Sequence, residues 1–327
     1  MSEGGGMTVL DGTHLRSLQI SLPDSAVNLN GAELLDFADS KASDSLFGLS
    51  LPQSLKFSAF QRLNITDDVT FRKTELTREA ATDKLNHYLT AIADELKDNP
   101  LVVSVLDGNT LRLFLEDEDD FAMLAENLFT ELDIEDKGKI SKCEIRNALV
   151  NMGVEMGIPP FEELPLLNDI LNKHGAEGEG DLGQSQFAEL LQPILQEVAD
   201  TLSQKHVVII QNIKIVNGSE LRKLLMTEKK LNNVTEKMLQ DKRGKKAGQN
   251  NAEIIRDFLE ENGKELGLPA SEANEAVVLL YDAVFSDIKN EKCAAESEDE
   301  FKELVKEILE KFAEQLEANP VYCDLDN

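Results

Sequence analysis

The sequence predicts a mainly α-helical protein built from tandem repeats, with short β segments where the repeats join. Three observations predict this class. The chain repeats itself about every one hundred residues, its apolar residues recur at helical spacing, and short apolar runs precede Asp-Gly or Asn-Gly pairs. With 327 residues, 41% of them hydrophobic, the chain is long enough for two or three domains with packed cores.

The repeats are recognised at both of their ends. Similar segments open them at residues 9–16, 105–112 and 215–222, and similar segments close them at 91–96, 197–202 and 311–316. Ordered agreement at both ends of three repeats is hard to obtain by chance, so we expect a duplicated chain. The expected boundaries are a disordered N-terminus at 1–7, repeat one at 8–103, repeat two at 104–213 and repeat three at 214–327.

Within the repeats, apolar residues at i, i+3, i+4 and i+7 predict amphipathic helices over 121–132, 145–156, 187–202 and 301–316. Pro193 lies inside the third of these segments and should kink or restart that helix, since proline removes a helical donor. Apolar runs at 101–106 and 207–216 end at Asx-Gly pairs, which predicts a strand and a turn at each junction between repeats.

The charge balance narrows the classes of partner. Asp and Glu number 62 against 33 Lys and Arg, a net charge of -29. We therefore expect no nucleic acid partner, because a polyanion would be repelled, whereas cations and basic protein segments are favoured. No apolar run approaches the roughly 18 residues of a membrane span, and Cys143, Cys293 and Cys323 show no paired spacing. A cytoplasmic protein, possible also in the nucleus, is expected.

Residues 133–144 lie between two predicted helices and have the spacing of an EF-hand loop, so the best EF-hand is expected near 121–156. Gly138 stands sixth, where the chain must turn sharply, and Ile140 stands eighth, where two such loops pair through their backbones. The expected Ca²⁺ ligands are Asp133, Glu135, Lys139 through its backbone carbonyl, Ser141 through a water, and Glu144.

The lysines of this loop leave its affinity for a metal ion undecided. Lys137 stands fifth, where an oxygen ligand is usual, and Lys139 and Lys142 add further positive charge. Two interpretations remain: a loop that keeps the EF-hand shape without useful affinity, or a weak calcium or magnesium site.

The partner loop is best placed at 175–186, with Gly180 sixth and Leu182 eighth. Gly175 and Gln186 hold its first and twelfth positions, so no specific metal site is expected there. Poorer loops are expected at 243–254 and 289–300 in repeat three, and at 39–50 and 69–80 in repeat one, where Leu46 and Leu76 stand eighth.

Residues 107–112, 115–121, 133–144 and 198–200 resemble a plant-specific family of EF-hand proteins. That family includes calcium sensors that bind and inhibit Snf-related stress protein kinases. The resemblance covers repeat two well and the other repeats through duplication. It implies tandem EF-hand-like helix–loop–helix pairs, calcium as cofactor, ligands on Asp133, Glu135, Lys139, Ser141 and Glu144, and a protein kinase as one class of partner. Lys137 departs from the family pattern.

We therefore expect a calcium-binding sensor or regulatory adaptor that acts through protein contacts. An enzyme is not expected, because the four histidines are scattered and no phosphate-binding loop is present. The alternative is a calcium-independent scaffold whose helix pairs accept an amphipathic helix. Met152 and Met156 would then line its groove or belong to its core, and the basic cluster 242–246 would dock an acidic partner or be a solvated loop.

Overall fold

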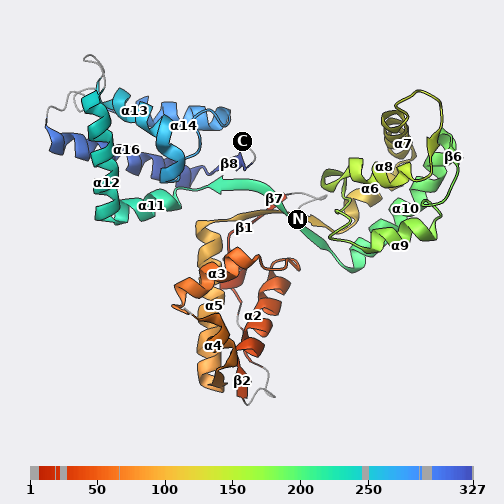
Figure 1. Cartoon of the computed structure of the whole chain (residues 1–327), viewed down its shortest axis with the longest axis horizontal. Helices are drawn as coiled ribbons and strands as arrows, with labels where there is room; N and C mark the ends of the chain where they lie inside the picture. Colours follow the sequence, from red (N-terminus) through yellow and green to blue (C-terminus); the bar gives the residue numbers. More distant parts are fainter. Residues whose placement is uncertain are drawn as a thin grey trace. The chain divides into compact units, whose positions relative to one another are not determined.

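The computed structural model describes residues 7–18, 20–22, 28–65, 67–244, 250–286, 288 and 297–325. Over these residues the protein is mainly helical with a few short strands, which confirms the predicted class (Figure 1). It divides into two bodies: Met1–Ile92 with Val102–Gln211, and Ala93–Leu101 with Asn212–Asn327. We call them the first and second body. Residues 1–6 of the expected disordered N-terminus lie outside the described residues, and Met7 begins a strand.

Repeat one opens the first body. Its elements are β1 (Met7–Leu10), α1 (Thr13–Arg16), β2 (Asn28–Asn30), α2 (Gly31–Ser45), α3 (Gln53–Arg62), α4 (Asp68–Lys73), β3 (Glu75–Thr77) and α5 (Arg78–Asp98), whose last turns belong to the second body. β2 and β3 form an antiparallel ladder in which Leu29 faces Leu76. The helix α2 packs against α4, and its buried face includes Leu34, Leu35 and Ala38.

Repeat two follows, and it belongs to the first body from Val102 to Gln211. Its elements are β4 (Leu101–Leu106), α6 (Asn109–Glu116), α7 (Glu118–Leu132), β5 (Ile140–Ser141), α8 (Glu144–Met152), η1 (Val154–Met156), α9 (Leu166–Lys173), β6 (Asp181–Leu182) and α10 (Gln184–Gln204). The predicted face of α7 is buried at Phe121, Leu124 and Leu128. Pro193 does not divide α10, which continues to Gln204. The first part of β7 (Val207–Val216) also belongs to this body.

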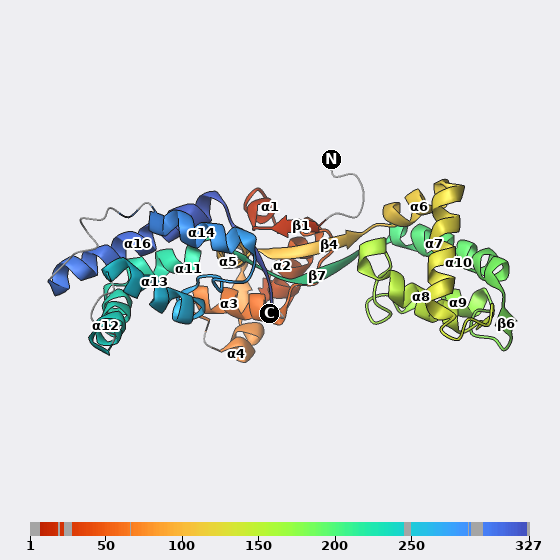
Figure 2. The same cartoon turned by 90° about the horizontal axis from the view of Figure 1, so that it is seen from above.

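Repeat three forms most of the second body. Its elements are α11 (Ser219–Met226), α12 (Glu228–Gly244), α13 (Asn251–Asn262), η2 (Gly263–Leu266), α14 (Glu275–Ser286), α16 (Glu298–Ala318) and β8 (Val321–Asp324). The long helix α16 packs against α11, α12, α13 and α14 (Figure 2). The second part of β7 pairs antiparallel with β8, with Val216 facing Val321.

The same corner opens each repeat. After the strand, the side chain of Asp11, Asp107 or Asn217 accepts a hydrogen bond from the backbone N–H two residues later, at 2.9, 2.9 and 3.2 Å. The glycine between them has φ of +78°, +83° or +79°, a backbone conformation that glycine adopts without strain. A short helix then begins. The junction strands predicted at 101–106 and 207–216 are confirmed with those bounds.

Candidate functional site

The loop predicted to bind calcium is framed by two helices, as expected. The helix α7 ends at Leu132 and α8 begins at Glu144. Asp136 and Gly138 have φ of +50° and +66°, so the chain turns sharply between them. The glycine expected at the sixth position therefore meets a real backbone requirement.

The Asp133 carboxylate holds this turn together. Its Oδ1 accepts a hydrogen bond from the Lys137 backbone N–H at 2.9 Å, and its Oδ2 accepts one from the Gly138 N–H at 2.6 Å. A carboxylate has about four acceptor positions, so two remain for another donor or a cation. Asp133 thus forms the turn and keeps acceptor capacity for a further donor or a cation.

The other predicted ligands are bonded locally. The Glu135 carboxylate forms an ion pair with the Lys137 ammonium. Ser141 Oγ lies 3.1 Å from Cys143 Sγ, and Glu144 Oε2 accepts a hydrogen bond from Asn147 Nδ2 at 2.7 Å within α8. In the part of the chain that is described, no group of three or more His, Cys, Asp or Glu side chains is placed to hold a metal.

The donor set nevertheless has the chemistry of a weak oxygen site. Asp133, Glu144, the Lys139 carbonyl and a water on Ser141 are the oxygen donors that Ca²⁺ takes. Glu135 pairs with Lys137 at the exposed surface of the loop, so a positive charge already stands beside this carboxylate. A bound Ca²⁺ would have to compete with this ammonium, so the residues favour low affinity.

The second loop is tied to the first by a short antiparallel ladder. Ile140 faces Leu182 and Ser141 faces Asp181, and the Lys142 N–H donates to the Gly180 carbonyl at 3.0 Å. Ile140 and Leu182 are the two residues predicted to stand eighth. The backbone pairing therefore supports the alignment of the second loop at 175–186.

Arg146 adds a side-chain link between the two helix–loop–helix segments. It donates to Glu177 Oε1 at 2.7 Å and to Asn168 Oδ1 at 2.7 Å, and its guanidinium stacks 4.4 Å from the Phe161 ring centroid. Glu177, one of the acidic residues of the second loop, is thus paired with an arginine. On the neighbouring helices, Lys173 and His174, each 2.8 Å from Glu197, hold the pKa of the Glu197 carboxyl below its usual value.

In repeat one, the predicted placement of the first loop is wrong. Residues 39–45 belong to α2, and it is Leu29, not Leu46, that faces Leu76 across the ladder. Leu76 of the predicted loop 69–80 does lie in that ladder, but residues 69–73 of this loop belong to α4, so its bounds are also wrong. The error arose because a buried apolar residue was the sole guide to the loop, and Leu46 is buried at the end of a helix.

In repeat three, residues 245–249 and 289–296 of the two predicted loops lie outside the described residues, as do the side chains of the basic cluster 242–246. The helices that follow are described. Asn250 caps α13 and Glu253 bonds back to it, as Glu300 bonds back to Ser297 at the start of α16. Glu253 thus takes at the start of α13 the place that Glu300 takes at the start of α16.

A groove adjoins the loop 133–144. It has a volume of about 440 Å³ and is formed by α7, the end of α8 and η1. Its lining residues are Leu124, Glu126, Asn127, Leu128, Thr130, Glu131, Asn151 and Met156. Of the two methionines considered from the sequence, Met152 is buried in the core, whereas Met156 lines this groove.

Comparisons with protein-family models, with curated proteins and with solved structures found no match. None of the helices in the described part of the chain combines the length and the apolar composition that crossing a membrane requires.

A second pocket lies in repeat one, and no sequence motif predicts it. The signal that could have found it is the helical spacing of Leu34, Ala38, Leu85 and Tyr88.

Proposed function

We propose that the protein is a regulatory adaptor that holds a basic amphipathic helix in the groove between α7 and α8. The observation that carries this proposal is the lining of the groove. Met156 supplies partly exposed apolar contact above the buried Leu124 and Leu128, and Glu126 and Glu131 supply negative charge beside it. Helix-in-groove recognition needs this combination, and a flexible thioether adapts to different partner side chains.

The charge of the whole chain supports the same class of partner. A net charge of -29 attracts basic segments at long range and raises their association rate. The resemblance of repeat two to kinase-binding calcium sensors suggests a protein kinase as one bearer of such a helix.

Calcium would change the binding of a helix in this groove only weakly. The loop 133–144 joins the two helices that form the groove, so a cation held by Asp133 and Glu144 would change the angle between them. Because Lys137 already pairs with Glu135, we expect the groove to bind its helix without calcium and to respond little to it. This favours the scaffold over the dedicated sensor, which remains the second candidate.

The test is a fluorescence titration of the full-length protein with a labelled basic amphipathic peptide, in EDTA and in calcium. Met156→Lys would place a positive charge in the groove and should weaken binding at least tenfold. Met123→Lys is the matched control, since Met123 is 59% exposed on α7 and is not among the groove residues. Equal effects of the two changes would contradict the proposal.

The calcium arm separates the two candidates. Tighter peptide binding in calcium, lost in Glu144→Gln, would establish a sensor built on the loop 133–144. Binding that is the same in EDTA and in calcium would establish the scaffold.

A further inference from the structure

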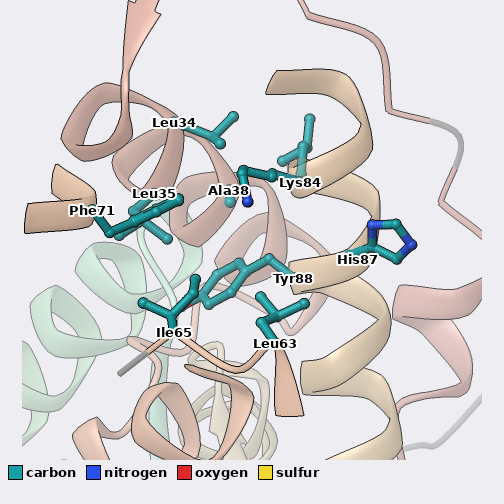
Figure 3. A pocket seen from close by; sticks show the side chains of 10 residues that line it. Leu34, Leu35, Ala38, Leu63, Ile65, Phe71, Lys84, His87 and Tyr88 are labelled. Atoms are coloured by element: carbon teal, nitrogen blue, oxygen red, sulfur yellow. The ribbon is translucent and has the colours of Figure 1, made fainter. Parts of the chain in front are cut away.

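Repeat one contains an apolar pocket between α2, α4, α5 and the segment after α3 (Figure 3). Leu34, Ala38 and Leu85, all buried, form part of its wall, and Ile65 and Phe71 complete it. Its volume is about 120 Å³. An apolar cavity of about 150 Å³ accommodates benzene, so this pocket has room for one small ring or one branched aliphatic group.

One charged residue stands at the edge of this apolar space and is itself exposed to solvent. The Lys84 side chain extends from α5 toward Ala38 of α2 (Figure 3), and its ammonium lies 5.5 Å from the Phe71 ring centroid. Among the described residues, no carboxylate forms an ion pair with Lys84. The His87 ring, which also borders the pocket, points away from the other lining side chains (Figure 3). The pocket therefore offers a cation without a counter-ion.

The neighbouring carboxylates do not compete for that cation. Asp39 accepts a hydrogen bond from the Tyr88 hydroxyl at 2.9 Å and pairs with the Lys56 ammonium at 2.5 Å. Burial and the charge of Asp39 raise the pKa of Tyr88, so its hydroxyl keeps the proton that it donates. Asp68 is paired with Arg72 at 2.9 Å. Asp39 and Asp68, two carboxylates beside the pocket, thus already have cationic partners.

We propose that this pocket binds a small apolar monocarboxylate, with its ring or branched chain among the leucines and its carboxylate on Lys84. The carboxylate would gain a charge-assisted hydrogen bond and would replace the weaker contact of the ammonium with Phe71. A ligand amine would be repelled by Lys84. A dicarboxylate would leave its second charge in an apolar environment, which is costly. The ligand is therefore a monoanion of roughly five to eight carbons.

The test uses benzoate, benzamide and benzylamine as probes of one size and three charge states. Binding of each to the full-length protein is measured by isothermal titration calorimetry, with circular dichroism to confirm that every variant is folded. We expect benzoate to bind at least tenfold more tightly than benzamide, and benzylamine not to bind. Equal binding of benzoate and benzamide would overturn the assignment of the carboxylate to Lys84.

Variants of two lysines locate the site. Lys84→Met keeps the length and apolar character of the side chain and should weaken benzoate binding at least tenfold, whereas Lys84→Arg should retain it. Lys41→Met is the matched control, because the Lys41 ammonium lies 5.8 Å from the Phe37 ring centroid and outside the pocket. Benzoate binding that is indifferent to Lys84, or no binding of benzoate at millimolar concentration, would overturn the proposal. The second result would favour a partner side chain as the occupant.

Discussion

Two separate requirements fix the glycines that open the repeats. Gly108 and Gly218 have positive φ, and each also lies against the backbone of the long helix that closes its repeat. A Cβ added to Gly108 would lie 2.3 Å from the Ala199 carbonyl oxygen, and one added to Gly218 would lie 2.8 Å from the Ala313 carbonyl oxygen. Any larger residue must therefore displace the helix from the corner.

Gly108→Ala should consequently destabilise the protein more than Gly138→Ala does. Gly138 also has positive φ, but a Cβ there would meet no atom within 4 Å. We expect about 1–2 kcal/mol for the backbone strain at Gly138, and about 3 kcal/mol or more at Gly108, where a packed helix must also move. Urea unfolding of the two variants measures the difference. Equal costs would show that the contact with Ala199 relaxes freely.

Ionisation of the buried Tyr281 hydroxyl should lower the stability of the second body at high pH. Burial of the ring, and then the charge of Glu260, raise the pKa of its hydroxyl from 10.0 to about 12. A phenol with a raised native pKa stabilises the fold fully below pH 10, and this contribution is lost as the pH rises through about 12. The loss is on the order of 2–3 kcal/mol.

Tyr281→Phe has no hydroxyl to ionise, so the stability of this variant should not show the extra fall above pH 10. At neutral pH it should cost about 1 kcal/mol, since Tyr281 donates long hydrogen bonds of 3.3 and 3.4 Å to the carbonyls of Leu259 and Pro269. Thermal unfolding from pH 7 to pH 11.5 checks both effects. A variant with the same alkaline slope as the parent protein would mean that another group causes it.

The residues of the candidate metal loop could be predicted from spacing, whereas their bonding could not. The twelve-residue spacing placed Asp133, Gly138 and Glu144 correctly relative to the helices. The ion pair between Glu135 and Lys137 depends on how two side chains two residues apart turn in a tight loop. Sequence spacing does not contain that information.

At the level of elements, a common cap starts the helices that follow the loops. The side-chain oxygens of four residues accept the backbone N–H three residues later: Asn30, Thr77, Asn250 and Ser297. In three of the four, a glutamate at that later position bonds back to the cap, at Glu33, Glu253 and Glu300. Glu300, the twelfth residue of the loop predicted at 289–300, therefore caps a helix.

The cap predicts different costs for two similar substitutions. Asn250→Ala removes a capping box at the start of α13 and should destabilise the second body by about 1 kcal/mol. Ser141→Ala should cost close to nothing, because Ser141 Oγ contacts Cys143 Sγ and caps no helix. Hydrogen exchange of the amides in α13 and α8 provides the measurement. Unchanged protection of α13 in Asn250→Ala would contradict the capping role.

Elements were predictable where two independent signals coincided. The strands at the repeat junctions combine β-branched residues with an Asx-Gly turn, and their bounds were correct. The loop predicted at 243–254 depends on Gly248, which lies outside the described residues, and α13 begins within it at Asn251. In repeat one, nothing in the apolar pattern distinguished Leu46 at a helix end from Leu29 in a strand.

At the scale of the whole molecule, repeats two and three each bury their own core. The buried cluster of repeat two is drawn from residues 106–207, and that of repeat three from residues 216–321. Both are centred on fully buried aromatic rings. Phe187 packs 5.8 Å from Phe129 in the first, and Phe312 packs 4.9 Å from Tyr281 in the second, measured between ring centroids. Separate cores favour separate opening of the two repeats.

Reciprocal core substitutions should reveal that independence. Phe187→Ala and Phe312→Ala each remove a fully buried ring and should cost about 3–5 kcal/mol within their own cluster. In native-state hydrogen exchange, Phe187→Ala should accelerate the protected amides of residues 104–213 by at least a hundredfold and leave residues 214–327 within threefold of the parent protein. Phe312→Ala should do the reverse. If either variant accelerated amide exchange in both repeats by the same factor, the two cores would open as one cooperative unit. The sequence repeats would then not be independent units of stability.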